Sequence, residues 1–197
     1  MATVEEITAL LHHLSPASLE QVRQLVQSLR EQDAGAAAQP GPQASHWSFD
    51  FVDHFSDATF TASRDPTGME CKVADATCDG VTRPALWEHP PVAGSAVVAY
   101  LVAIPNGVRR VQLKFSIGIR DGAELPADQF VAFRILVNGW KLWSTVKNSH
   151  SWEEHAIEMP QLGSDVVRVE FVTDGLGHHR WDWAVWGLPR LEEKSEG

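Results

Sequence analysis

The side chains most able to do chemistry in this sequence are aromatic and basic groups in its C-terminal half. The 197 residues include eight tryptophans, which is more than a small core requires. Ligand sites combine aromatic rings with a few polar groups, and a sugar suits them because its C–H face stacks on a ring while Asp, Asn or Arg bonds its hydroxyls. Tryptophan also anchors cores and protein interfaces. The sequence therefore predicts either a glycan-binding surface or an interface with a partner protein.

The ligand-binding patch that we predict combines loop tryptophans with a basic segment. Two tryptophans flank the Asn138-Gly139 turn, and a third lies in a polar loop. Loops at the end of a sandwich are where binding groups cluster. Trp87 is a weaker candidate, because a tryptophan in that context more often packs. The predicted ligand-binding residues are Trp140, Trp143, Trp152, His178, His179, Arg180, Trp181 and Trp183.

The sequence gives little support for catalysis or for a catalytic metal. Gly-x-Ser-x-Gly, the P-loop pattern and Gly-x-Gly-x-x-Gly after a strand are all absent. The nine histidines lack the spacing of a metal centre. We therefore expect a protein that is not an enzyme and has no cofactor. A structural calcium ion is the exception, with oxygen ligands from Glu70, Asp75 and Asp79 in a Gly-containing loop region.

The two cysteines, Cys71 and Cys78, leave two alternatives open. Two free thiols are favoured in a reducing compartment, and a disulfide-closed loop is the alternative in an oxidising one. The N-terminal sequence, residues 1–6, is acidic and lacks the positive start of a secretory signal, so we expect a cytoplasmic protein.

Charge and hydropathy exclude further classes of partner. The formal net charge is −10 and no basic patch interleaved with aromatics is visible, so nucleic acid and anionic membrane surfaces are not expected partners. No apolar run approaches the roughly 18 to 20 residues of a membrane span.

Hydrophobic spacing divides the chain into four parts. Residues 1–33 have two stretches with helical spacing, the second announced by Ser15 as N-cap and Pro16 at the first helical position, and they predict a helical hairpin. Residues 34–45 are rich in Ala, Gly, Gln and Pro and predict a flexible linker. Residues 46–191 predict a β-sandwich, and residues 192–197 a tail. The spare apolar stripe of residues 4–29 needs a partner, which is another copy of the chain, a different protein or the sandwich itself. A helical hairpin of this kind is a common self-association device, so homo-oligomerisation is expected.

After the linker the hydrophobic period changes to two. Residues 111–119 alternate strictly between apolar and other side chains, and residues 131–137 repeat the period of two with large apolar residues at 131, 133, 135 and 137. Asn138-Gly139 predicts a tight turn into residues 140–143. Further strands are predicted at residues 47–52, 96–104, 153–159, 166–172 and 180–186. Many short strands without intervening helices favour an antiparallel sandwich.

Four segments occur in an order that resembles a known family. They are Leu113-x-Phe115-x-Ile117-Gly118-Ile119-x-Asp121, Val131-x-Phe133-x-Ile135-x-Val137-Asn138-Gly139, Val167-x-Val169-x-Phe171-Val172-Thr173-Asp174-Gly175 and Asp182-x-Ala184-x-Trp186. The series, within residues 96–191, resembles the NPCBM-type carbohydrate-binding modules of bacterial glycosidases, in the galactose-binding-like jelly-roll superfamily. The resemblance implies a mainly β, jelly-roll β-sandwich and carbohydrate binding without catalysis.

The same resemblance assigns faces to the last predicted strand. It places Asp182, Ala184 and Trp186 inward, so Asp182 is expected to be a buried carboxylate satisfied by backbone donors. Trp181 and Trp183 would then face outward. The first functional hypothesis is a lectin-like module that binds a glycan or glycoconjugate through loop aromatics. The second is a structural or adaptor protein that uses the sandwich and the hairpin for protein–protein assembly.

Overall fold

A computed structural model describes residues 18–19, 21–27, 47–160 and 166–194. The chain divides into two compact units, Met1–Ser45 and His46–Gly197. In the first unit, residues 18–19 and 21–27 are helical, within the second predicted helix. The first predicted helix and the linker 34–45 lie outside the described residues. The hairpin and self-association through residues 4–29 therefore stay predictions.

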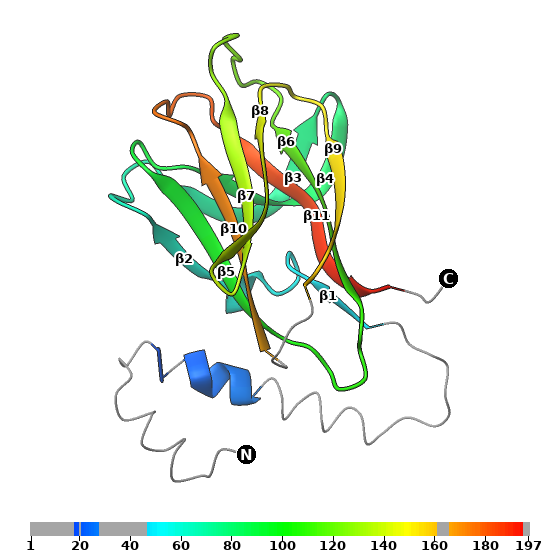
Figure 1. Cartoon of the computed structure of the whole chain (residues 1–197). Coiled ribbons are helices and arrows are strands. Elements are labelled where there is room, and N and C mark those ends of the chain that lie inside the picture. Colours follow the sequence, from blue (N-terminus) through cyan, green and yellow to red (C-terminus); the bar gives the residue numbers. More distant parts are fainter. Residues whose placement is uncertain (1–17, 20, 28–46, 161–165, 195–197) are drawn as a thin grey trace. The chain divides into compact units, whose positions relative to one another are not determined.

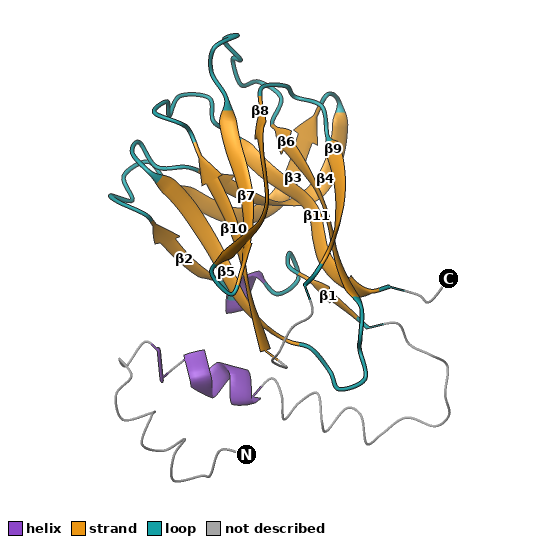
Figure 2. Ribbon diagram, in the orientation of Figure 1, coloured by secondary structure: helices purple, strands orange, loops and turns teal. Residues whose placement is uncertain are grey.

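The second unit is a sandwich of two antiparallel β-sheets (Figures 1 and 2). The first sheet has the order β3-β4-β11-β6-β9, with β1 paired to β11, and the second has the order β2-β5-β10-β7-β8. The elements are β1 (Ser48–Asp50), the 3-10 helix η1 (Phe55–Asp57), β2 (Thr59–Ala62), β3 (Glu70–Cys78), β4 (Val81–His89), β5 (Ser95–Ala103), β6 (Val111–Ile119), β7 (Val131–Val137), β8 (Trp140–Lys147), β9 (Glu153–Glu158), β10 (Val166–Asp174) and β11 (Ala184–Glu193). The predicted antiparallel sandwich is confirmed.

The core lies between the inner faces of the two sheets. Strands β6 and β7 have the predicted bounds, and their alternate apolar residues, such as Phe115 and Phe133, are buried there. Trp186 of β11 is fully buried among them. The predicted Asn138-Gly139 turn is confirmed by positive φ at both residues, 51° and 81°, the conformation that a two-residue hairpin turn requires.

Strands β3 and β4 form a hairpin that the sequence analysis missed. Their turn is Asp79-Gly80, with φ of 50° and 73°, and Asp-Gly is a strong hairpin signal. The expected Gly-containing loop region is instead a strand and a tight turn, because Glu70 and Asp75 lie on β3. Calcium binding itself stays a prediction. At about 3.3 Å per residue, Glu70 and Asp79 are roughly 30 Å apart. Within the described ranges, no group of three or more His, Cys, Asp or Glu side chains could hold a metal ion.

The two cysteines are free thiols near opposite ends of β3. The seven residue-to-residue steps along the strand separate their Cα atoms by roughly 23 Å, whereas a disulfide needs less than about 7 Å. Cys71 packs against the main core and Cys78 lies in a second, smaller apolar cluster. Burial raises the pKa of the Cys78 thiol to about 12. The alternative of a disulfide-closed loop is excluded by this geometry.

The tip of the β3–β4 hairpin packs on the outer face of the first sheet, over β6 and β11. Two glycines make the close approach possible. A Cβ on Gly118 would lie 2.6 Å from Cys78 Sγ, and one on Gly187 would lie 2.9 Å from the Trp152 ring. The Trp152 indole N–H also donates to the carbonyl of Val81, at 2.8 Å. Glycine is required at both positions because a side chain there would push the hairpin off the sheet.

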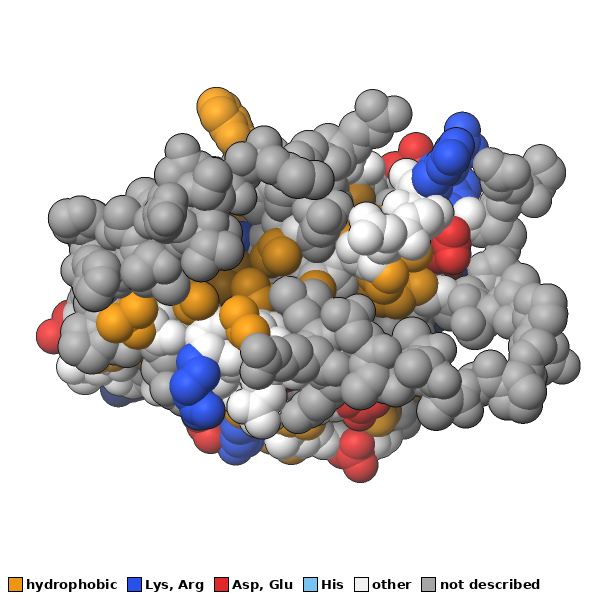
Figure 3. Space-filling view, turned by 90° about the horizontal axis from the view of Figure 1, so that it is seen from below, with side chains coloured by type: hydrophobic (Ala, Val, Ile, Leu, Met, Phe, Trp, Pro, Cys, Tyr) orange, Lys and Arg blue, Asp and Glu red, His pale blue; other side chains and the backbone are white. Residues whose placement is uncertain are grey.

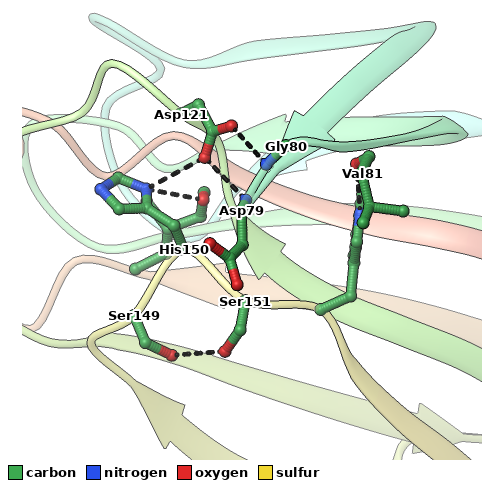
Figure 4. Close-up of polar contacts among 9 residues, drawn as sticks. Asp79, Gly80, Val81, Asp121, Ser149, His150 and Ser151 are labelled. Carbon is green, nitrogen blue, oxygen red and sulfur yellow. Dashed lines mark hydrogen bonds and ion pairs between the residues drawn. The ribbon is translucent and has the colours of Figure 1, made fainter.

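Asp121, which follows β6, fixes the hairpin turn (Figure 4). Its carboxylate accepts the backbone N–H of Asp79 at 2.8 Å and of Gly80 at 3.0 Å. These two hydrogen bonds lower the pKa of Asp121 because they favour its charged form. The nearby His150 Nδ1 lies 3.1 Å from the carbonyl of Ile119. The end of β6, the hairpin and the loop before β9 are thus held together.

The surface seen from below mixes side chains of different kinds (Figure 3). Hydrophobic side chains lie in the middle of the described surface, and basic and acidic ones stand in small groups around them. In the part of the chain that the structure describes, no helix is long and apolar enough to cross a membrane.

Candidate functional site

Two neighbouring rows of side chains on the outer face of the first sheet form the candidate site. In one row, Lys72 of β3 lies opposite Trp87 of β4, which lies opposite Val185 of β11. In the next row, Glu70 lies opposite His89. Every second residue of a strand shares a face, so residues 70 and 72, like 87 and 89, point to the same side. This side is opposite to the core.

The second row continues to Trp183, the residue just before the start of β11. The backbone N–H of Arg120, just after β6, donates to the carbonyl of Trp183 at 3.1 Å. The two residues thereby extend the pairing of β6 with β11 and complete a cavity of about 300 Å³. We call it the outer-face pocket, and it is lined by Glu70, Lys72, Trp87, His89, Arg120, Trp183 and Ala184.

Arg120 lies in the outer-face pocket against two tryptophan rings. Its guanidinium carbon is 3.4 Å from the ring centroid of Trp87 and 5.1 Å from that of Trp183. Such stacking on aromatic faces is favourable for a guanidinium. Burial lowers the pKa of Arg120, because loss of water disfavours the charged form. No acceptor among the described residues takes a hydrogen bond from its side chain.

The other polar side chains of the pocket are held by partners of their own. Lys72 Nζ is 2.6 Å from Glu70 Oε1 and 4.2 Å from the ring centroid of Trp87. His89 Nδ1 is 2.7 Å from the carbonyl oxygen of Asp182. A carbonyl only accepts, so Nδ1 carries the proton, and Nε2 of the neutral ring is an acceptor.

Asp182 lies directly behind the pocket and is buried, as predicted. Its expected partners are wrong, because Oδ1 accepts a hydrogen bond from the side-chain amide of Gln129 at 3.0 Å and not from backbone donors. Its Oδ2 has no hydrogen-bond partner. Burial raises the pKa of Asp182. The reason for the difference is local: residues 181–183 are not yet in a strand, so the side-chain amide of Gln129 reaches the carboxylate.

The three tryptophans predicted in loops and turns lie apart from one another. Trp140 is 82% exposed beside the β7–β8 turn. Trp143 packs into the core, with its ring centroid 5.0 Å from that of Phe115. Trp152 lies on the glycines beneath the β3–β4 hairpin. None of the three lines the outer-face pocket.

The predicted residues between β10 and β11 lie closer to the pocket. Trp183 lines it, and the ring of Trp181 is 5.3 Å from that of Trp183. The ring of His179 is 6.1 Å from that of His89. His178 and Arg180 are exposed. Because β11 begins at Ala184, the predicted strand of residues 180–186 is wrong over its first four residues, and Trp181 has a φ of 69°.

Sequence reasoning missed most of the outer-face pocket. Arg120, Lys72 and His89 were not singled out, Glu70 was assigned to calcium, and Trp87 was ranked as a packing residue. One signal could have found part of it. The Asp79-Gly80 turn places residues 72 and 87 opposite each other, because each lies the same number of positions from the turn.

The sequence matches no family model and no curated protein. The fold is similar to several solved structures at low sequence identity. One is a CBM27-1 module from Caldicellulosiruptor saccharolyticus in complex with mannohexaose, at 12% identity and TM-score 0.49, covering 78% of this chain and 100% of that one. Another is CBM51 from Clostridium perfringens GH95 in complex with methyl-galactose, at 9% identity and TM-score 0.48, covering 74% and 99%.

A third similar structure holds the CBM51-2 and INT domains of Clostridium perfringens ZmpB in complex with GlcNAc. The identity is 12% and the TM-score 0.46, and the match covers 68% of this chain but only 29% of that one. All three contain a carbohydrate-binding module.

Proposed function

We propose that the protein binds a carbohydrate, without catalysis, in the outer-face pocket. The observation that carries the proposal is the guanidinium of Arg120, stacked on Trp87 and free of any acceptor of its own among the described residues. Its N–H groups are donors, and His89 Nδ1 faces the carbonyl of Asp182, which leaves Nε2 directed to other partners. A sugar hydroxyl both donates and accepts, so it suits both groups. The nearby Trp183 ring supplies an apolar surface.

The residues of the pocket favour binding over reaction. Its lining includes no Ser, Thr or Cys nucleophile, and its single carboxylate, Glu70, is paired with Lys72. Glycoside hydrolysis ordinarily needs two carboxyl groups on either side of the bond. The pocket has a volume of about 300 Å³, at the small end of ligand sites. It suits one or two sugar rings.

A glycan array with two tryptophan variants tests this proposal. The wild-type protein is expected to bind at least one class of glycan. The variant Trp183→Ala removes a ring of the pocket and is expected to weaken binding about tenfold, from lost stacking. The matched control is Trp140→Ala, which removes an exposed tryptophan outside the pocket and should bind as the wild type does.

Circular dichroism would establish that both variants are folded. Loss of binding in Trp140→Ala with retention in Trp183→Ala would move the site to the β7–β8 turn. A folded wild-type protein that binds no glycan on the array would contradict the proposal. The alternative is protein–protein assembly through the sandwich and the hairpin. Most of residues 1–33 lie outside the described residues, and this alternative stays a prediction.

A further inference from the structure

We propose that the sugar in the outer-face pocket carries a single carboxylate, which pairs with the guanidinium of Arg120. This inference rests on the proposed function and names the class of ligand. Arg120 is the one half-buried lysine or arginine in the described structure that has neither an ion pair nor a side-chain hydrogen bond.

Arg120 differs from the other basic residues of the sandwich in this respect. Arg83 is paired with Glu154, Arg134 with Asp174, and even the buried Lys147 lies 3.6 Å from a carboxylate oxygen of Glu153. The remaining described lysines and arginines without such partners are all exposed, and water can solvate them: Arg64, Arg109, Arg110, Lys141 and Arg180. Among the lysines and arginines that the structure describes, only Arg120 is partly withdrawn from water without an acceptor to replace it.

The stacking of Arg120 selects the kind of anion. With its guanidinium carbon 3.4 Å from the ring centroid of Trp87, one face of the group is covered. The N–H bonds of a guanidinium point outward in its own plane, so they stay available at its edge. A carboxylate is planar and accepts two parallel hydrogen bonds from such an edge. Holding the guanidinium in place beforehand reduces the entropy lost on binding.

The charges of the pocket set the number of carboxylates. Lys72 and Arg120 are positive and Glu70 is negative, which leaves one net positive charge from these three side chains. Lys72 lies 2.6 Å from Glu70 and offsets its repulsion of an anion. The whole chain, however, has a net charge of −10 and would repel a highly charged polymer. The pocket therefore fits a sugar with one acidic group better than a polysulfated chain.

Two pairs of simple glycosides test the inference by titration calorimetry or NMR. Methyl glucuronide and methyl glucoside differ only in a carboxylate or a hydroxymethyl group at C6, as do methyl galacturonide and methyl galactoside. We expect the acidic member of at least one pair to bind about tenfold more tightly. The variant Arg120→Gln should abolish this preference, and Arg120→Lys should reduce it, because an ammonium lacks the planar fork.

The matched control is Lys141→Gln, which removes one exposed positive charge on the other sheet and should leave the acid preference unchanged. Equal affinity for the acidic and neutral members would overturn this inference alone, since carbohydrate binding would remain. A preference that survives in folded Arg120→Gln would also overturn it. Failure of all four glycosides and of the glycan array would overturn the proposed function as well. Tighter binding of heparin than of either uronide would show that the pocket takes sulfated polyanions instead.

Discussion

Tryptophans on or next to strands β4 and β11 belong to two groups of side chains, which lie on opposite sides of the same sheet. On the inner side, Trp186 of β11 meets Glu88 of β4. On the outer side, Trp87 of β4 and Trp183, just before β11, meet Arg120. A single step along β4, from residue 87 to residue 88, leads from one group to the other. The two groups combine the same kinds of side chain, an indole and an ionisable group, in different ways.

The inner group is enclosed in the core, although Glu88 Oε1 has no hydrogen-bond partner there. Trp186 is fully buried, its indole N–H donates to Glu88 Oε2 at 2.6 Å, and its ring lies 5.1 Å from those of Phe133 and Phe171. The outer group is open, because the N–H donors of Arg120 have no acceptor within the described residues. Buried polar groups are ordinarily paired. Both groups contain an unpaired polar atom, but only that of the outer group lies in a pocket at the surface, where a ligand can reach it.

Removing the inner indole should have the largest effect. We expect Trp186→Ala to lower the free energy of unfolding by about 3–5 kcal/mol, because it leaves a cavity in the core and takes a hydrogen-bond donor from Glu88. Denaturant titration of the variant measures this. A loss below 1 kcal/mol would mean that the inner group is not what stabilises the sandwich.

Glu88→Gln should change how the stability depends on pH. Burial raises the pKa of Glu88 above its ordinary value of 4.5, so between these two values the folded state binds more protons than the unfolded state. Stability then falls as the pH rises from 4.5 through the raised pKa. A neutral glutamine lacks this loss, and we expect it to improve stability at pH 8 relative to the wild type by about 1 kcal/mol or more.

Unfolding curves at pH 5 and pH 8 would check this prediction. The pKa of Asp182 is also raised by burial, so this residue also makes stability fall as the pH rises. It is present in both proteins, and its effect cancels in the comparison. An unchanged difference between wild type and variant at the two pH values would show that Glu88 keeps the same protonation state over this range.

Arg120→Gln should separate binding from stability. We expect the free energy of unfolding to change by about 1 kcal/mol or less, since the substitution removes a partly exposed cation–π contact, while the acid preference of the pocket is lost. Denaturant titration and calorimetry on the same sample measure both. A stability loss as large as that of Trp186→Ala would make Arg120 a structural residue like those of the inner group.

Trp140→Ala should have the smallest effect. This side chain is 82% exposed, and exposed substitutions usually change stability by less than about 0.5 kcal/mol. Thermal unfolding and a glycan array should both match the wild type. Lower affinity for every glycan would show that the β7–β8 turn belongs to the binding surface, as the sequence analysis predicts.

The sequence by itself determined the strands that have a clear two-residue hydrophobic period. Residues 111–119 and 131–137 became β6 and β7 with unchanged bounds, because a period of two specifies which side chains enter the core. The family resemblance correctly placed Trp186 and Asp182 inward. The period of two does not extend to residues 180–183, where a positive φ at Trp181 breaks the alternation before the strand begins.

Only the tertiary structure decided which outward-facing residues meet. The outer-face pocket brings together Glu70 of β3, Arg120 just after β6 and Trp183 just before β11. These residues lie far apart in the sequence. Alternation gives the face on which a side chain lies, but not which strands are neighbours or how they are aligned. That choice comes from burial of the whole core and from the glycines that let the β3–β4 hairpin pack on the sheet.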